Sequence, residues 1–147
     1  MVKRFNDYSK ANGARMDAKE FLVLAGAAVL AERRAVRILE SMRERDERRA
    51  AMSNMHVCDR GIDRKREEIE RYRDTIDDAL AVLDSMREVA PGKLRRCADV
   101  LEYRYIEHMD WKSIAHAVGM SMSSVKGDIN DGIRWLNENG AIGKKPE

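Results

Sequence analysis

A seven-residue apolar repeat in the middle of the chain limits the possible fold more than any other feature. Ile62, Ile69, Ile76, Leu83 and Ala90 stand seven residues apart. The intermediate positions carry further apolar residues, namely Tyr72, Ala79, Leu80 and Met86. Such a repeat is typical of a helix that packs against another helix along its whole length. The pattern therefore predicts a long helix with a helical partner.

The segment before this repeat is the expected partner. Residues 17–49 contain no proline and a single glycine, Gly26. Apolar residues recur there with the three-and-four spacing of one helix face: Phe21, Leu24, Ala25, Ala28, Ala31, Ala35, Ile38, Leu39 and Met42. The pattern stops over residues 52–61, where Gly61 can turn the backbone. We therefore expect a long antiparallel, coiled-coil-like helical hairpin over residues 17–90, after a flexible N-terminus at 1–16.

Composition agrees with an all-α fold. Of the 147 residues, 37% are charged, 5% are aromatic and two are proline, which favours solvated helices over a strand-rich fold. Lys and Arg (28) nearly balance Asp and Glu (26), so the net charge of +2 creates no strong field for a nucleic acid or a membrane. No apolar run approaches the ~20 residues of a membrane span, and no secretory signal is recognisable. We expect a cytoplasmic protein without a membrane partner.

The C-terminal third predicts three short helices around one apolar centre, over residues 93–138, with a flexible tail at 139–147. Asp110 is the expected N-cap of the middle helix. Gly119 permits the left-handed backbone of a tight turn, and the small Ala115 lets two helices cross closely. Because Val125 follows Ala115 by ten residues, it can fill the corner between them. This spacing predicts a helix-turn-helix unit.

The residues of this unit carry a family resemblance. The segment Leu101–Ala115, LEYRYIEHMDWKSIA, with the following Val118-Gly-Met-Ser121 and Ser124-Val125-Lys126, resembles region 4 of sigma-70-type RNA polymerase factors. The match covers about residues 94–137. With the hairpin before it, the chain is similar to sigma-like phage regulators of the ArpU/RinA type. The resemblance implies a DNA-binding transcription regulator of a phage or prophage that acts with host RNA polymerase.

The resemblance also implies that the last helix enters the major groove of double-stranded DNA with its N-terminal residues at the base edges. The expected DNA-binding residues are Ser121, Ser123, Ser124, Lys126, Gly127, Asn130 and Arg134. Lys126 and Arg134 suit phosphate contacts, and Asn130 can pair with an adenine edge. The aromatic side chains are expected in the core instead, at Tyr105, Trp111 and Trp135.

Two acidic residues depart from the pattern of the family. Asp128 and Asp131 lie three apart on the last helix, and we expect them on its surface, close to the path of the phosphates. Residues 95–147 contain eight Lys or Arg and eight Asp or Glu. A neutral module binds DNA weakly on its own. The expected compensation is a homodimer through the helical hairpin, or a polymerase that holds the factor on the promoter.

Other functional classes share parts of this pattern. A phage DNA-packaging protein of the small-terminase type also combines a helix-turn-helix with oligomerising helices, and the module is alternatively a protein-interaction unit that has lost strong DNA binding. We find no Ser/His/Asp arrangement and no phosphate loop, so we do not expect the protein to be an enzyme. Cys58 and Cys97 show no metal-ligand spacing, nor do the three histidines, so we expect free thiols, no metal and no cofactor.

Overall fold

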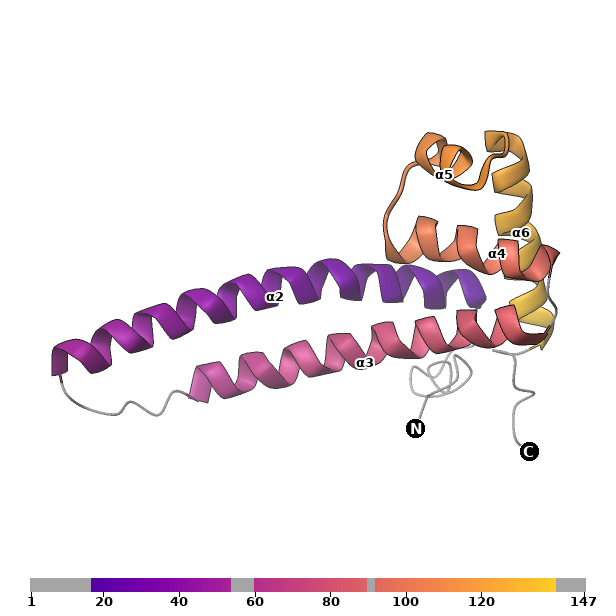
Figure 1. The fold of residues 1–147 in the computed structure, drawn as a ribbon. Coiled ribbons are helices and arrows are strands. Elements are labelled where there is room, and N and C mark those ends of the chain that lie inside the picture. The colour runs from indigo at the N-terminus through magenta and orange to yellow at the C-terminus, as the bar shows by residue number, and fades with distance from the viewer. Residues whose placement is uncertain (1–16, 54–59, 90–91, 140–147) are drawn as a thin grey trace, which may run out of the picture.

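The computed structural model describes residues 17–53, 60–89 and 92–139, and every regular element in these ranges is a helix (Figure 1). The elements are α2 (Ala18–Ser53), α3 (Arg60–Val89), α4 (Lys93–Leu101), the π-helix η1 (Glu102–Ile106), α5 (Trp111–Val118) and α6 (Met122–Asn139). The all-α prediction is confirmed. The expected flexible N-terminus at 1–16 lies outside the described residues, as do Cys58 and residues 140–147 of the tail expected at 139–147. Asn139, the first residue of that expected tail, belongs to α6 instead. Within the described ranges, no helix has the length and apolar character needed to cross a membrane.

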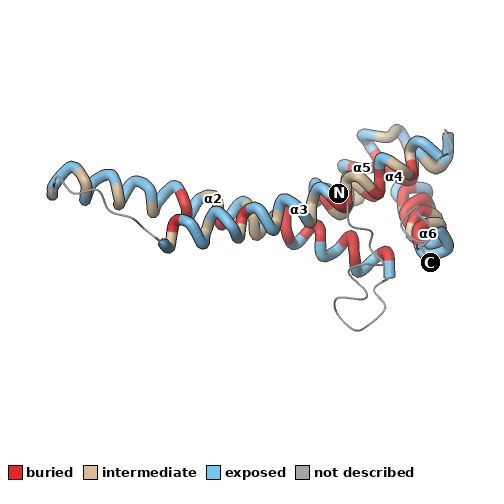
Figure 2. Tube along the Cα trace, turned by 90° about the horizontal axis from the view of Figure 1, so that it is seen from below, coloured by how far each residue is buried: buried red, intermediate tan, exposed pale blue. Residues whose placement is uncertain are grey.

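Helices α2 and α3 lie side by side and run antiparallel, and they diverge toward the end where α2 finishes and α3 begins (Figures 1 and 2). Four residues of the seven-residue repeat lie on the side of α3 that packs inward: Ile62, Ile69 and Leu83 are buried and Ile76 is half-buried. Ala90, the last residue of the repeat, lies outside the described residues. A small cluster holds the diverging end together, made of Ala35, Leu39, Ile62 and Ile69. Burial of each leucine or isoleucine side chain contributes about 1.5–3 kcal/mol. Packing of this kind, rather than helix propensity, stabilises long helices in water.

The face that α2 buries differs in part from the expected one, although Phe21, Ala25, Ala28, Ala35 and Leu39 are buried as predicted. Leu24 and Ile38 are exposed, whereas Leu22 and Val29 are buried. At 100° per residue, Phe21, Ala28 and Ala35 follow one line along the helix, and Leu24, Ala31 and Ile38 follow a neighbouring line about 60° away. The sequence prediction merged these two lines into one buried face, although only the first of them is buried.

The C-terminal helices pack on the N-terminal end of α2 and the C-terminal end of α3 (Figure 1). One core joins all of them. Its largest fully buried side chains come from every helix: Phe21, Leu22, Leu83, Met86, Leu101, Ile114, Val125 and Leu136. Cys97 lies in this core, where burial raises the pKa of its thiol to about 11. The C-terminal helices and the hairpin thus share a single hydrophobic centre.

A glycine in α2 sets how closely the C-terminal helices approach. The backbone carbonyl of Tyr105 lies where a Cβ on Gly26 would stand. His108, whose φ is +55°, makes a 2.8 Å hydrogen bond between its Nε2 and the carbonyl oxygen of Gly26. At the start of the helix, the backbone N–H of Ala18 donates to Oδ1 of Asn137 at 2.8 Å. Helix α2 is therefore in direct polar contact with both the η1–α5 connection and the end of α6.

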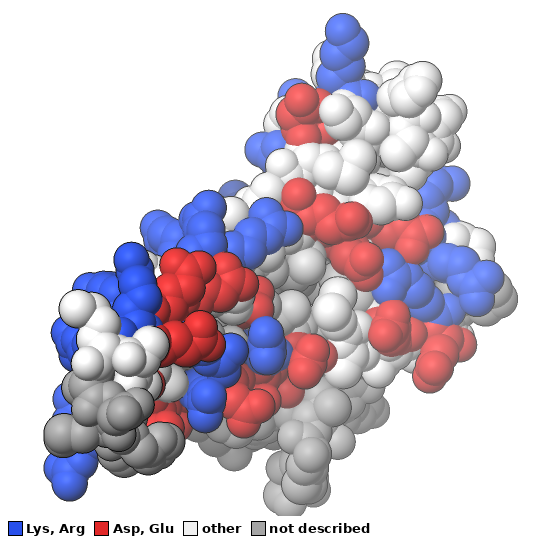
Figure 3. Space-filling view, turned by 60° about the vertical axis from the view of Figure 1, so that its left-hand side comes forward, with Lys and Arg blue, Asp and Glu red and all other residues white. Residues whose placement is uncertain are grey.

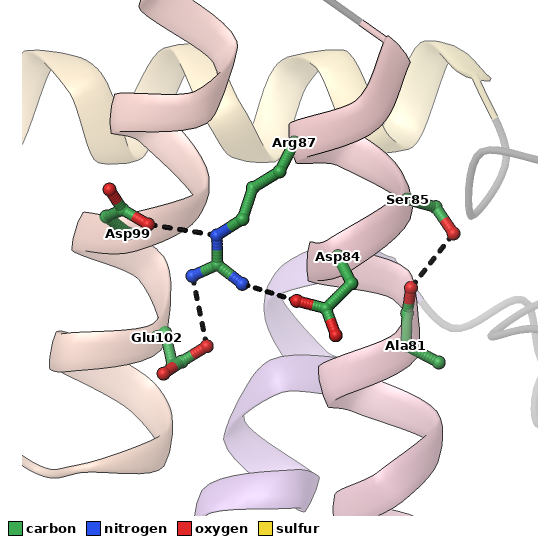
Figure 4. A network of polar contacts seen from close by, with 6 residues as sticks. All are labelled: Ala81, Asp84, Ser85, Arg87, Asp99 and Glu102. Carbon is green, nitrogen blue, oxygen red and sulfur yellow. Dashed lines mark hydrogen bonds and ion pairs between the residues drawn. The ribbon is translucent and has the colours of Figure 1, made fainter. Parts of the chain in front are cut away.

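Arg87 forms the main polar link between α3 and the C-terminal helices (Figure 4). Its guanidinium donates to Asp84 at 2.7 Å, to Asp99 on α4 at 2.9 Å and to Glu102 on η1 at 3.0 Å. The Arg87 side chain is only 20% exposed. Burial disfavours its charge, but the hydrogen bonds to Glu102, Asp99 and Asp84 outweigh this and raise the pKa of Arg87. Three carboxylates on three elements thus depend on one cation.

Residues 102–106 do not continue α4 as a regular α-helix. From Glu102 the helix widens into η1, and the backbone N–H of Glu107 donates to the carbonyl of Glu102 at 3.0 Å, five residues back. The N–H of Met109 reaches the carbonyl of Tyr103 at 2.9 Å. The wider turn directs the carbonyl of Tyr105 toward α2, because one extra residue is accommodated per turn.

Candidate nucleic-acid interface

The turn between α5 and α6 is built by three local signals in the sequence. Asp110 caps α5: its Oδ1 accepts from the backbone N–H of Ser113 at 2.7 Å. These hydrogen bonds hold the pKa of the Asp110 carboxyl below its ordinary value. Gly119 ends α5 with φ 67° and ψ 36°, and the N–H groups of Gly119 and Met120 bond back to the carbonyls of His116 and Ala115. This is the hydrogen-bond pattern of a glycine-terminated helix end.

Ser121 begins the next helix. Its hydroxyl accepts from the backbone N–H of Ser124 at 3.1 Å and donates to the Ser124 hydroxyl at 2.9 Å. Ala115 and Val125 are buried between α5 and α6, as the spacing predicted. The caps at Asp110 and Ser121 and the glycine turn together fix how α6 leaves α5.

All seven residues predicted to contact DNA are exposed: Ser121, Ser123, Ser124, Lys126, Gly127, Asn130 and Arg134. Four of them follow one line along α6, because Ser123, Gly127, Asn130 and Arg134 are spaced by four, three and four residues. We call these four residues the outer line of α6. Lys126 lies beside it, and Ser121 and Ser124 lie at the start of the helix. The opposite side of α6 is buried at Val125, Asp128, Ile129, Gly132 and Leu136.

The prediction that Asp128 and Asp131 lie on the surface of α6 is wrong for Asp128, whereas Asp131 is partly exposed. Asp128 is only 4% exposed and pairs with Arg96 of α4, through Nε–Oδ2 at 2.6 Å and Nη2–Oδ1 at 3.3 Å. Asp131 pairs with Lys93 at 2.8 Å, and this hydrogen bond lowers the pKa of Asp131. The physical reason is helical phase, because position 128 lies three residues after Val125 and four before Gly132 and so turns toward α4. These two carboxylates hold α6 on α4. The outer line of α6 contains no acidic residue, and the nearest one is Asp131, 3.7 Å from Arg134 at the margin of the line.

The sequence did not reveal the surroundings of Trp111. This half-buried ring packs against the core, as do Tyr105 and Trp135, but it also carries two cations. The guanidinium of Arg104 lies 4.1 Å and the ammonium of Lys126 lies 5.3 Å from the ring centre. A cation over an indole face is favourable. The contact directs Lys126 toward α5, into the angle between the two helices.

The charges elsewhere are mixed. On the face of the molecule that Figure 3 shows, Lys and Arg alternate with Asp and Glu over the hairpin without a broad area of one sign. Among the described residues, no group of three His, Cys, Asp or Glu is arranged to hold a metal ion. Neither a protein-family model, nor a curated protein, nor a solved structure matches the chain.

Proposed function

We propose that this protein is a DNA-binding transcription regulator of the sigma-factor type, encoded by a phage or prophage and acting with host RNA polymerase. In this proposal α5, the turn at Gly119 and α6 are a helix-turn-helix, and α6 is the recognition helix. The two long helices form the hairpin that precedes it.

The observation that carries the proposal is the exposed outer line of α6, which begins at the helix N-terminus. Ser123 and Gly127 are small, so a helix backbone can approach the floor of a groove closely at these positions. Asn130 offers the amide that pairs with an adenine edge, and Arg134 and Lys126 offer cations for phosphates. Because Asp128 and Asp131 are paired with α4, the carboxylates that weakened the sequence argument do not oppose this contact.

The test is a DNA selection with the full chain and host RNA polymerase, followed by titrations of the selected duplex at several salt concentrations. Asn130→Ala should lose discrimination at one base pair, about tenfold or more, since a bidentate contact contributes ~1–3 kcal/mol. Lys126→Ala should weaken binding to all sequences alike and reduce the salt slope by up to ~0.9. The matched control is Lys19→Ala, an exposed lysine at the start of α2, which should change neither quantity.

A role in protein binding is the second candidate, because Met122, at the first position of α6, leaves 49% of its surface exposed. Capture of polymerase without any measurable affinity for duplex DNA would favour it. A packaging protein would instead assemble into a ring of many copies, which particle mass distinguishes from both.

A further inference from the structure

Helix α2 carries a second apolar face that nothing in the described chain covers. Between residues 23 and 38, four of its large apolar side chains are exposed: Val23 (51%), Leu24 (40%), Leu30 (43%) and Ile38 (46%). With Ala27 and the half-buried Ala31 they occupy roughly 120° of the helix surface, centred about 130° around the helix from the buried line of Phe21, Ala25 and Leu39. We call these six residues the outer stripe of α2. Arg34 is the one charged residue within this stripe. An exposed apolar stripe on a charged protein indicates an interaction surface.

We infer that the outer stripe of α2 binds the same stripe of a second copy of this chain, with the two helices antiparallel and crossing between Leu30 and Ala31. In that arrangement Val23 of one copy faces Ile38 of the other. The small Ala27 faces Arg34, whose aliphatic stem can lie over it. Because the arrangement is two-fold symmetric, each of these contacts forms twice in the dimer.

The charges along α2 select the antiparallel orientation and the second copy as occupant. Glu20 is exposed at one end of the stripe, and Arg37 and Arg45 are exposed at the other. Antiparallel pairing places Glu20 between these two arginines of the second copy. Parallel pairing would instead place Arg34 against Arg34 at the centre and Glu20 against Glu20. Like charges at such close range are repulsive.

The size of the stripe predicts the strength of the association. From Val23 to Ile38 the helix is about 22 Å long, at 1.5 Å per residue, which is shorter than a permanent interface requires. Alanines at positions 27 and 31 allow the helices to approach to about 8 Å. We therefore expect a dimer in exchange with monomer at micromolar concentrations. DNA has no part in this association, so it can be tested separately from the proposed function.

Cysteine cross-linking of the full chain tests the orientation. The background is Cys58→Ser; Cys97 stays in place, because it is buried and its thiol pKa is about 11. Leu30→Cys, next to the crossing point, should cross-link to itself under mild oxidation. Val23→Cys and Ile38→Cys should cross-link when mixed and about tenfold less when each is oxidised alone. Efficient self-cross-linking of Val23→Cys, or no cross-linking by any variant, would overturn the inference.

Sedimentation equilibrium tests the surface. Leu30→Glu should raise the dimer dissociation constant at least about tenfold. The matched control is Val89→Glu, which places the same charge on another exposed apolar residue, 57% exposed at the end of α3, and should leave the constant unchanged. Circular dichroism should show equal helix content in all three proteins, since both positions are at the surface. A wild-type chain that remains monomeric at several hundred micromolar, or equal effects of the two substitutions, would refute the proposed interface.

Discussion

Replacement of Gly26 by alanine should destabilise the protein, although alanine is the better helix former. Gly26 lies inside α2, where intrinsic propensity favours alanine by about 1 kcal/mol. The structure predicts the opposite sign, because the new Cβ would overlap the backbone carbonyl of Tyr105. A backbone atom cannot rotate away as a side chain can, so the η1–α5 connection must shift.

The magnitude follows from two costs and one gain. Overpacking of a close contact costs about 1–3 kcal/mol. The shift also weakens the hydrogen bond between His108 and Gly26, which contributes about 0.5–1.5 kcal/mol. After subtraction of the propensity gain, Gly26→Ala should lower the free energy of unfolding by about 2 kcal/mol. For a chain of this size that corresponds to a melting temperature roughly 6–10 °C lower.

Gly127 provides the matched comparison. It lies inside α6 and is exposed, and a Cβ built there meets nothing within 4 Å. Gly127→Ala should therefore raise the free energy of unfolding by about 0.5–1 kcal/mol. Urea denaturation followed by circular dichroism measures both variants. If Gly26→Ala were as stabilising as Gly127→Ala, the close approach of the C-terminal helices to α2 would be wrong.

Two further predictions concern the C-terminal helices. Arg96→Ala should cost about 2–3 kcal/mol in urea denaturation, since it leaves the buried Asp128 carboxylate unpaired. Arg95→Ala, at the exposed neighbour, should cost less than about 0.5 kcal/mol, and equal losses would argue against the ion pair. Asp110→Ala should cost about 1 kcal/mol at pH 7 through the lost cap of α5. Because the pKa of Asp110 is lowered in the folded protein from its ordinary value of 3.8, its contribution is complete above that value and is lost as the pH falls through the lower folded pKa. The difference between wild type and variant should therefore shrink as the pH is lowered below 3.8 in acid titrations of stability, and a difference independent of pH would contradict the capping role.

Local signals in the sequence predicted local structure well. The seven-residue spacing of Ile62, Ile69 and Leu83 indicated the buried side of α3, and Asp110 and Gly119 indicated where α5 begins and ends. Each of these signals acts within one or two helical turns. They can be recognised without knowing what lies across the fold.

The errors arose where the answer depends on a distant partner. Asp128 is buried because Arg96 stands 32 residues earlier in the chain, and no spacing within α6 reveals that pair. A helical period likewise finds two apolar stripes on α2 but does not tell which one faces the core. The π-helix at 102–106 is also a tertiary effect, since its register is coupled to the contact of Tyr105 with Gly26. The two cations on the Trp111 ring could have been anticipated from the sequence. Arg104 and Lys126 belong to the same small module as Trp111, and a cation over an indole ring is a recurrent arrangement.

The attachment of the C-terminal helices to only one end of the hairpin turns the rest of α2 into a spacer. Contacts at Ala18, Gly26 and Arg87 hold that end in place, while the helix continues for 27 residues from Gly26 to Ser53. At 1.5 Å per residue the free end stands about 40 Å away, slightly more than one helical turn of DNA. A molecule bound at that end would be held at a fixed distance and direction from anything that α6 contacts. Lengthening both long helices by two turns would move that molecule outward by about 11 Å, without altering its own contacts or those of α6.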